Sequence, residues 1–172
     1  MADQNLPPIV VMGVQGCGKS TAGRAIGERL GLPFIDGDDL HPLANKQKVA
    51  GGNPLTDEDR EPWLGIIGRS LAEGLEHGEA RVIACSALKR RYRDQIRSFA
   101  PTVRFVHLAG EQDLIAGRLS GRNHEYMPPA LLDSQFQALE PLEADEAGIR
   151  LDITLSPQDI AEAVANALAG GR

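Results

Sequence analysis

Short apolar runs and longer amphipathic stretches alternate along the chain of 172 residues. The first apolar run is apolar throughout, as expected for a strand that is covered on both faces of a parallel sheet. The last run alternates apolar and polar residues, which is typical of a half-buried edge strand. We therefore expect strands at 9–12, 32–35, 81–85, 103–108 and 149–155.

Between these runs, apolar residues recur every three or four positions, which predicts helices. One helix is expected to start after Thr56, which together with Asp59 resembles a capping box. Its predicted buried stripe consists of Leu64, Ile67, Leu71 and Leu75. Ser156 is expected to cap the final helix, with Pro157 at the first helical position. Because strands and helices alternate, the fold class is α/β with a parallel sheet.

A glycine-rich motif follows the first strand and matches the phosphate-binding P-loop pattern G-x-x-x-x-G-K-[ST]. Glycines let the backbone approach a polyphosphate, and the helix that follows points its positive end at the anion. Lys19 is expected to reach the β- and γ-phosphates, and the Ser20 hydroxyl to bind Mg²⁺. A chance glycine-rich turn is the alternative, which the flanking strand and helix disfavour. The predicted nucleotide-binding residues are Gly13, Val14, Gln15, Gly16, Cys17, Gly18, Lys19, Ser20 and Thr21.

Three carboxylates, Asp36, Asp38 and Asp39, follow the second strand. Ligands of open α/β sheets bind at the carboxyl ends of the strands, where these residues are expected to lie. One carboxylate there can support Mg²⁺ while another accepts a proton from a substrate hydroxyl. The alternative is a solvated loop that caps the next helix, since Asp is a good N-cap residue.

Four of the five residues at 89–93 are basic, although the chain is acidic overall. Lys89 lies closest to the end of the third strand and is therefore the best candidate for binding an anionic ligand. Arg90, Arg91 and Arg93 are expected to form a solvated helix face. Taken alone, Arg60 is expected in a surface ion pair, Trp63 in the core, and His107 packed within its strand.

The polar segment 121–129 joins two predicted helices and carries glycine and proline at its ends. Such a loop can act as a mobile lid, because closure excludes water during phosphoryl transfer. Arg118 and Arg122 lie one helical turn apart and could clamp the nucleotide and the transferring phosphoryl group. An inert surface loop is the alternative.

Composition narrows the class of protein. A net charge of −6 argues against a dedicated nucleic-acid or membrane-surface binder. No apolar segment approaches the ~20 residues of a membrane span, and the first residues lack a signal-peptide pattern. We expect one domain, 1–172, in the cytoplasm, with no nucleic-acid or membrane partner. Cys17 and Cys85 are expected to be free thiols rather than a redox switch.

Several motifs, spread over nearly the whole chain, carry a resemblance to one family. They are the P-loop at 13–21, the acidic loop at 36–42, Asn45 with Lys48, the block at 54–64, Cys85 to Lys89, Tyr92 to Asp94, and Ser134 to Phe136. With these motifs the sequence resembles the small gluconate kinases of the P-loop kinase superfamily. One segment departs from the family: residues 123–126 read Asn-His-Glu-Tyr where many members have a Lys-Gly-His-Phe-like lid, so His124 and Glu125 receive no catalytic role.

The resemblance implies ATP-dependent phosphorylation of D-gluconate on its terminal hydroxyl, giving 6-phosphogluconate. It also implies a three-layer fold with five parallel strands, helices on both faces, a short lid, and often a homodimer. The implied catalytic residues are Lys19, Asp38 and Arg122. Asp38, His41, Arg60 and Lys89 would bind the substrate, Ser20 and Asp36 would hold Mg²⁺, and Arg118 would contact the nucleotide.

Two other functions remain open at this point. Another small-metabolite kinase of similar build, such as a shikimate-type kinase, would share the P-loop and differ in its acceptor. A non-catalytic nucleotide-binding module would bind ATP without transferring phosphate to a small acceptor.

Overall fold

A computed structural model describes residues 6–53, 55–120 and 129–170. Five strands form one sheet in the order β2-β3-β1-β4-β5, and every neighbouring pair is parallel, which confirms the predicted fold class. The strands are β1 (Ile9–Met12), β2 (Phe34–Asp36), β3 (Val82–Ala84), β4 (Arg104–Ala109) and β5 (Gly148–Asp152). The helices are α1 (Lys19–Leu30), α2 (Leu43–Ala50), α3 (Asp57–Glu76), α4 (Arg90–Phe99), α5 (Gln112–Ser120), α6 (Pro129–Ala138) and α7 (Pro157–Gly170), with a short 3₁₀ helix η1 (Gly37–Leu40) after β2.

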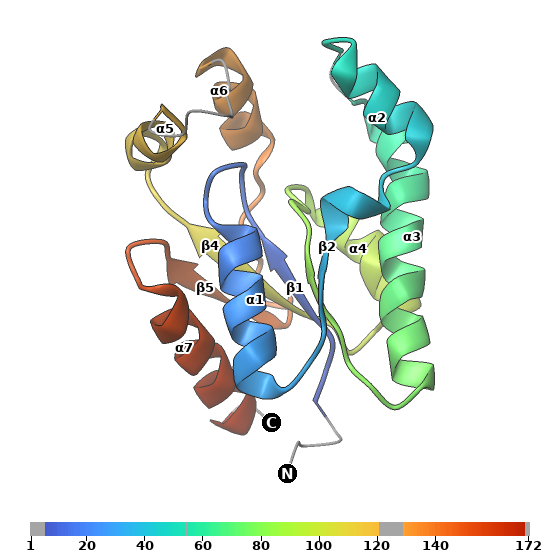
Figure 1. Ribbon diagram of the computed structural model, residues 1–172, viewed down its shortest axis with the longest axis vertical. Helices are drawn as coiled ribbons and strands as arrows, with labels where there is room; N and C mark the ends of the chain where they lie inside the picture. Colours follow the sequence, from blue (N-terminus) through green and yellow to red (C-terminus); the bar gives the residue numbers. More distant parts are fainter. Residues whose placement is uncertain (1–5, 54, 121–128, 171–172) are drawn as a thin grey trace.

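The central strand β1 explains why the sheet has two cores. All four of its residues are buried, and they alternate between the faces. Ile9 and Val11 pack with residues of α1 and α7, whereas Val10 and Met12 pack with residues of α3 and α4. The helices therefore cover both faces of the sheet (Figure 1). The P-loop, α2, α5 and α6 lie beyond the carboxyl ends of the strands.

The predicted helix caps are confirmed. Thr56 and Asp59 form a reciprocal capping box at the start of α3. The Ser156 hydroxyl accepts a hydrogen bond from the Asp159 N–H, and α7 begins at Pro157. The end of the predicted stripe on α3 differs, because Leu75 is 38% exposed in the last turn of the helix.

The edge strand is shorter than the predicted 149–155. It ends at Asp152, whose carboxylate accepts a hydrogen bond from the Thr154 N–H two residues later. Ile153 still donates its backbone N–H to the carbonyl of Ala109, the last residue of β4, at 3.0 Å. The turn ends the strand before the predicted Leu155. Ile153 remains buried even so, whereas Leu155 is exposed.

Arg93 departs from the predicted solvated face. Its side chain is 0% exposed and donates to Glu146 from Nε at 2.7 Å and from Nη2 at 3.0 Å. Buried charges are tolerated when a partner and further hydrogen bonds satisfy them, and here the Ala87 and Leu88 carbonyls supply those bonds. Arg91 remains exposed, as expected.

Among the described residues, no helix has both the length and the apolar composition needed to cross a bilayer.

Candidate active site

The P-loop between β1 and α1 has a backbone that suits a phosphate cradle. Gly13 has φ +150°, and a Cβ there would lie 2.6 Å from Cys17 Sγ and 2.9 Å from the Leu108 carbonyl oxygen. Gly18 caps α1 in the left-handed conformation, with φ +96°. The Lys19 ammonium folds back over the loop and donates to the carbonyls of Gly13 at 3.1 Å and Val14 at 3.2 Å. The loop is thus closed around the lysine that is expected to meet the phosphates.

The ends of α1 and β2 meet at two oxygen-bearing side chains. The Ser20 hydroxyl donates to Asp36 Oδ2 at 3.0 Å, and Asp36 Oδ1 accepts the Asp38 N–H at 3.0 Å. Hydroxyl and carboxylate oxygens are ligands that Mg²⁺ favours, and Mg²⁺ usually keeps several waters as well as substrate phosphates. Within the described residues, no group of three or more His, Cys, Asp and Glu side chains could hold a metal ion. The donor chemistry of Ser20 and Asp36, one hydroxyl and one carboxylate, fits a Mg²⁺ ion that is also bound by phosphate and water.

Asp38 and Lys19 both lie near Cys85, at the end of β3. Burial raises the pKa of the Cys85 thiol to about 12; the Ala87 backbone and the Lys19 charge oppose this rise, and the Asp38 charge adds to it. Asp38 is exposed on η1. Both cysteines are free and buried, and burial also raises the pKa of Cys17. Protonated, buried thiols are poor redox switches.

His41 lies directly against Trp63. The two rings stack with centroids 3.9 Å apart and an interplanar angle of 15°. Trp63 is in the core, as predicted, but its indole N–H also donates to the Gly37 carbonyl at 2.7 Å. Burial, followed by the charges of Arg60 and Lys46, lowers the pKa of His41 to about 4. His41 is therefore a neutral ring near Arg60 at physiological pH, and it joins η1 to the first turns of α3.

Arg60 and Lys89, both predicted to bind the substrate, lie over the same ring, that of Tyr92. The Arg60 guanidinium carbon and the Lys89 ammonium nitrogen each lie 5.7 Å from the centroid of the Tyr92 ring. Arg60 also donates to the Leu55 carbonyl at 2.9 Å and forms no ion pair with a described residue, contrary to the simple expectation for an isolated arginine. Lys89 pairs with Asp57 at 3.3 Å, and the Tyr92 hydroxyl and Arg91 contact the same carboxylate.

Asp57 and Tyr92 are the members of this cluster to which the sequence reasoning gave no role. Asp57 lies at the first position of α3, where an acidic residue is explained by the helix dipole alone. Tyr92 lies within the basic run and is 6% exposed. The sequence signal for Tyr92 is its position in the first turn of α4, among the four basic residues of the run 89–93.

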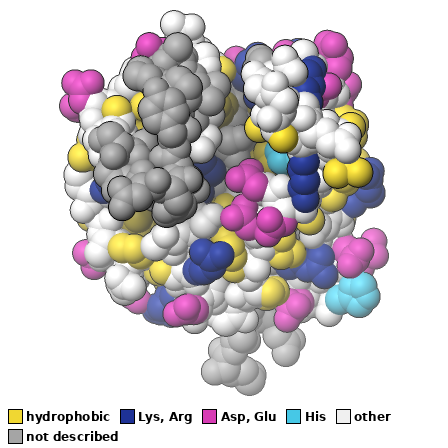
Figure 2. Space-filling view, turned by 45° about the horizontal axis from the view of Figure 1, so that its top comes forward, with side chains coloured by type: hydrophobic (Ala, Val, Ile, Leu, Met, Phe, Trp, Pro, Cys, Tyr) yellow, Lys and Arg dark blue, Asp and Glu magenta, His cyan; other side chains and the backbone are white. Residues whose placement is uncertain are grey.

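Arg118, predicted to contact the nucleotide, lies close enough to the P-loop for its charge to affect the pKa of Cys17. Its Nη2 donates to the Ile153 carbonyl at 2.8 Å, between β5 and α7. Its positive charge partly opposes the rise that burial causes in the pKa of Cys17 in the P-loop. Arg122 and most of the predicted lid at 121–129 lie outside the described residues. Figure 2 turns this end of the molecule forward and shows acidic side chains in the middle of the face, with basic side chains and a histidine beside them.

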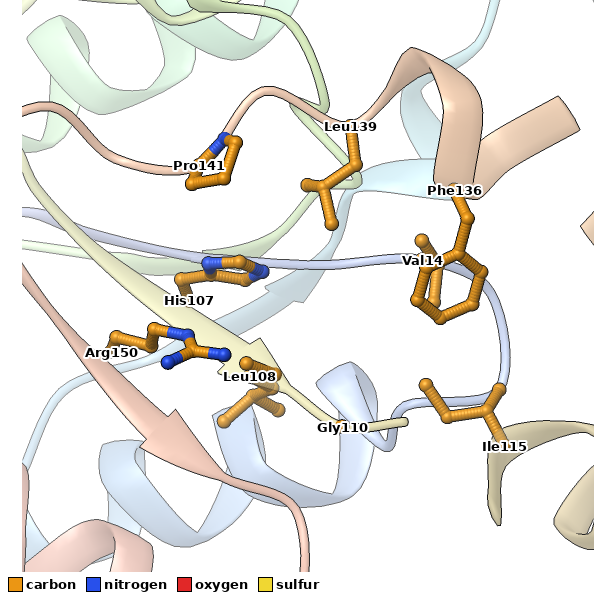
Figure 3. Close-up of a pocket in the computed structure, with 10 residues that line it drawn as sticks. Val14, His107, Leu108, Gly110, Ile115, Phe136, Leu139, Pro141 and Arg150 are labelled. Carbon is orange, nitrogen blue, oxygen red and sulfur yellow. The ribbon is translucent and has the colours of Figure 1, made fainter. Parts of the chain in front are cut away.

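A pocket of about 360 Å³ lies behind the P-loop, at the ends of β4 and β5. Its walls are mostly apolar and include Val14 of the P-loop, Leu108 of β4, and Phe136 and Leu139 from the end of α6 and the residue after it (Figure 3). Of the residues predicted to bind nucleotide or substrate, Val14 alone lines it. Residues of α6 and of the P-loop therefore line one pocket.

Together, the doubly covered parallel sheet, the glycine cradle and the Ser20–Asp36 pair define a P-loop kinase. The family model described as an AAA domain matches residues 9–142. Membership of the P-loop kinases implies that ATP is the phosphoryl donor.

The relatives identify the family. The thermosensitive gluconokinase of Escherichia coli (strain K12) is 43% identical over 154 residues, covering 89% of this chain and 82% of that protein. A gluconokinase structure from Sinorhizobium meliloti 1021 superposes with a TM-score of 0.85 at 43% identity, covering 95% of this chain and 91% of that one. A sugar kinase from Janibacter sp. HTCC2649 gives a TM-score of 0.88 at 41% identity, with 96% and 95% coverage. The chain belongs to the gluconokinase family.

Proposed function

We propose that this protein transfers the γ-phosphoryl group of ATP to the terminal hydroxyl of D-gluconate, giving 6-phospho-D-gluconate and ADP. The observation that carries the proposal is the convergence of Arg60 and Lys89 on Tyr92, at the same end of the sheet as the P-loop. Two fixed cations suit the single carboxylate of a sugar acid, since charge-assisted hydrogen bonds are stronger than neutral ones. The names of the gluconokinase relatives support the same acceptor.

On the donor side, the P-loop amides and Lys19 hold the phosphates and neutralise their charge. Ser20 and Asp36 hold Mg²⁺, which neutralises charge on the phosphate oxygens when it is bound. Arg118 contacts the nucleotide, and Arg122 acts on the transferring group. Because phosphoryl transfer depends on positioning and electrostatics, no covalent nucleophile is needed.

On the acceptor side, Arg60 and Lys89 fix the carboxylate end of gluconate. His41, whose ring is stacked on the buried Trp63, provides a flat, neutral surface for the carbon chain. Asp38 accepts the proton of the terminal hydroxyl or orients that hydroxyl toward the phosphate. Asp57 orients Lys89 through an ion pair and Tyr92 through a hydrogen bond.

The test is ADP release in the presence of ATP, Mg²⁺ and a panel of acceptors that contains gluconate, its C2 epimer, glucose and shikimate. We expect saturable turnover with gluconate and at least a hundredfold lower kcat/KM with glucose, which lacks the carboxylate. Absence of gluconate-dependent release would overturn the proposal, and turnover with shikimate alone would assign the protein to the other kinase class.

A further inference from the structure

A short segment at the end of α6 contacts both the P-loop and the loop between β3 and α4 that carries Lys89. Gln135, in the last turns of α6, accepts a hydrogen bond through Oε1 from the backbone N–H of Gln15, at 2.7 Å. Shortly after it, the Glu140 N–H donates to the Leu88 carbonyl at 2.7 Å. Glu140 Oε1 in turn accepts the Arg90 N–H at 2.8 Å. One segment of chain thus joins the two halves of the site.

At the nucleotide end, the Gln135 bond holds the middle of the phosphate cradle. Gln15 lies between Gly13 and Gly16, which both have positive φ. Glycines leave the flanking peptide groups free to rotate, so an acceptor from outside the loop restricts the plane of the peptide that contains the Gln15 N–H. The orientation of this peptide group also influences where the next N–H groups of the P-loop point, because the backbone links them.

At the substrate end, the Glu140 bond caps the helix that carries the basic run. Lys89 is the N-cap residue of α4, and its own side chain makes no capping hydrogen bond. The Glu140 carboxylate takes this place by accepting the N–H of Arg90, the first helical residue. A carboxylate at a helix N-terminus is favourable both as an acceptor and as a negative charge. The backbone at Lys89 is thereby fixed from outside its own helix.

The residues between these two contacts are packed. Phe136 and Leu139 line the same pocket as Val14 of the P-loop (Figure 3). Leu139 also packs against both cores of the sheet. Further along, the Pro141 carbonyl accepts a hydrogen bond from the buried Arg93. The segment is therefore anchored by apolar contacts along its length.

We propose that residues 135–140 form a brace that sets the distance between the ATP phosphates and the gluconate carboxylate, with Gln135 and Glu140 as positioning residues. This inference rests on the proposed function. Reacting atoms must be held about 3–3.5 Å apart for efficient transfer, and small misplacements are costly. Gln135 acts through the P-loop, and Glu140 acts through Lys89.

The test separates the two ends. Gln135→Met keeps the length of the side chain but removes the acceptor, and should raise KM for ATP about three- to tenfold, the effect of one lost hydrogen bond. KM for gluconate should stay within about twofold. Glu140→Met should raise KM for gluconate by a similar factor and leave KM for ATP unchanged, and Glu140→Gln, which keeps an acceptor, should restore it. Gln137→Met, on an exposed position of the same helix, is the matched control.

A second readout does not depend on turnover. Amide hydrogen exchange of Gln15, followed by NMR in the nucleotide-free protein, should quicken in Gln135→Met and not in Gln137→Met. If gluconate were the wrong acceptor, this exchange result and the affinity for a fluorescent ATP analogue would still respond to Gln135→Met. The brace is refuted if Gln15 exchange is unchanged, or if both variants raise both Michaelis constants equally.

Discussion

Ser20 and Asp36 are joined by a hydrogen bond of 3.0 Å from the hydroxyl to Oδ2, which connects the first turn of α1 to the end of β2. The bond brings together the two oxygen-bearing side chains that the proposed function assigns to Mg²⁺, from elements that are separated in sequence by the rest of α1. It also leaves Asp36 Oδ1 engaged with the Asp38 N–H, so the carboxylate is held from both sides. Fixed ligands of this kind lower the cost of ordering a metal site.

Asp36→Asn should therefore weaken the response to Mg²⁺. Loss of the carboxylate charge should raise the Mg²⁺ concentration for half-maximal activity about tenfold or more, in line with substitutions around other metal sites. Activity measured across a Mg²⁺ titration at saturating ATP and gluconate checks this. Asp39→Asn, on the exposed face of η1, is the matched control and should leave the titration unchanged. Coincident curves for Asp36→Asn and the parent would remove Asp36 from the metal site.

Asp38→Asn should abolish most turnover while ATP still binds. A positioned general base contributes about 10²- to 10⁴-fold, and the amide cannot accept the proton. We expect kcat to fall by a factor within that range and the affinity for a fluorescent ATP analogue to change less than about twofold, because the proposed function assigns Asp38 to the acceptor. Equal kcat in variant and parent would show that Asp38 has no part in proton transfer.

The buried ion pair of Arg93 and Glu146 should contribute more to the free energy of unfolding than the exposed ion pair nearby. Both side chains are 0% exposed. Glu146→Gln leaves the arginine charge buried without its partner and should lower the free energy of unfolding by about 3–5 kcal/mol. Asp145→Asn, which breaks the exposed pair between Arg90 and Asp145, should cost less than about 1 kcal/mol. Urea denaturation of both variants makes the comparison, and similar losses in the two would show that burial does not matter here.

Residues that act within one local motif were predictable from the sequence. The P-loop, the carboxylates after β2 and Lys89 after β3 each follow a strand directly, and the carboxyl ends of parallel strands meet at one edge. Topology therefore brought Lys19, Asp38 and Lys89 to the same end of the sheet without any knowledge of their contacts. The capping box at Thr56 was equally local.

Residues that act across the chain were not predictable in this way. Arg91 and Arg93 are alike in the sequence, and only the contact with Glu146, 53 residues later, distinguishes the buried one. The bond from Gln15 to Gln135 spans 120 residues, and nothing near either glutamine indicates it. The family resemblance marked the segment around Gln135 without giving a physical reason. That reason depends on tertiary packing.

His107 should make the protein less stable as the pH falls. It is 2% exposed on β4, and burial, followed by the charges of Arg150 and Arg93, lowers its pKa to about 4. The unfolded chain, with a pKa near 6.5, takes up the proton first, so the stabilising contribution is complete above about pH 6.5 and is lost as the pH falls toward about 4. Between pH 6.5 and 5, this imidazole alone should lower the free energy of unfolding by about 1.6 kcal/mol. His107→Leu removes the group, so urea denaturation at several pH values should show a shallower decline in the variant than in the parent. Parallel declines would mean that the imidazole is protonated in the folded protein as readily as in the unfolded chain.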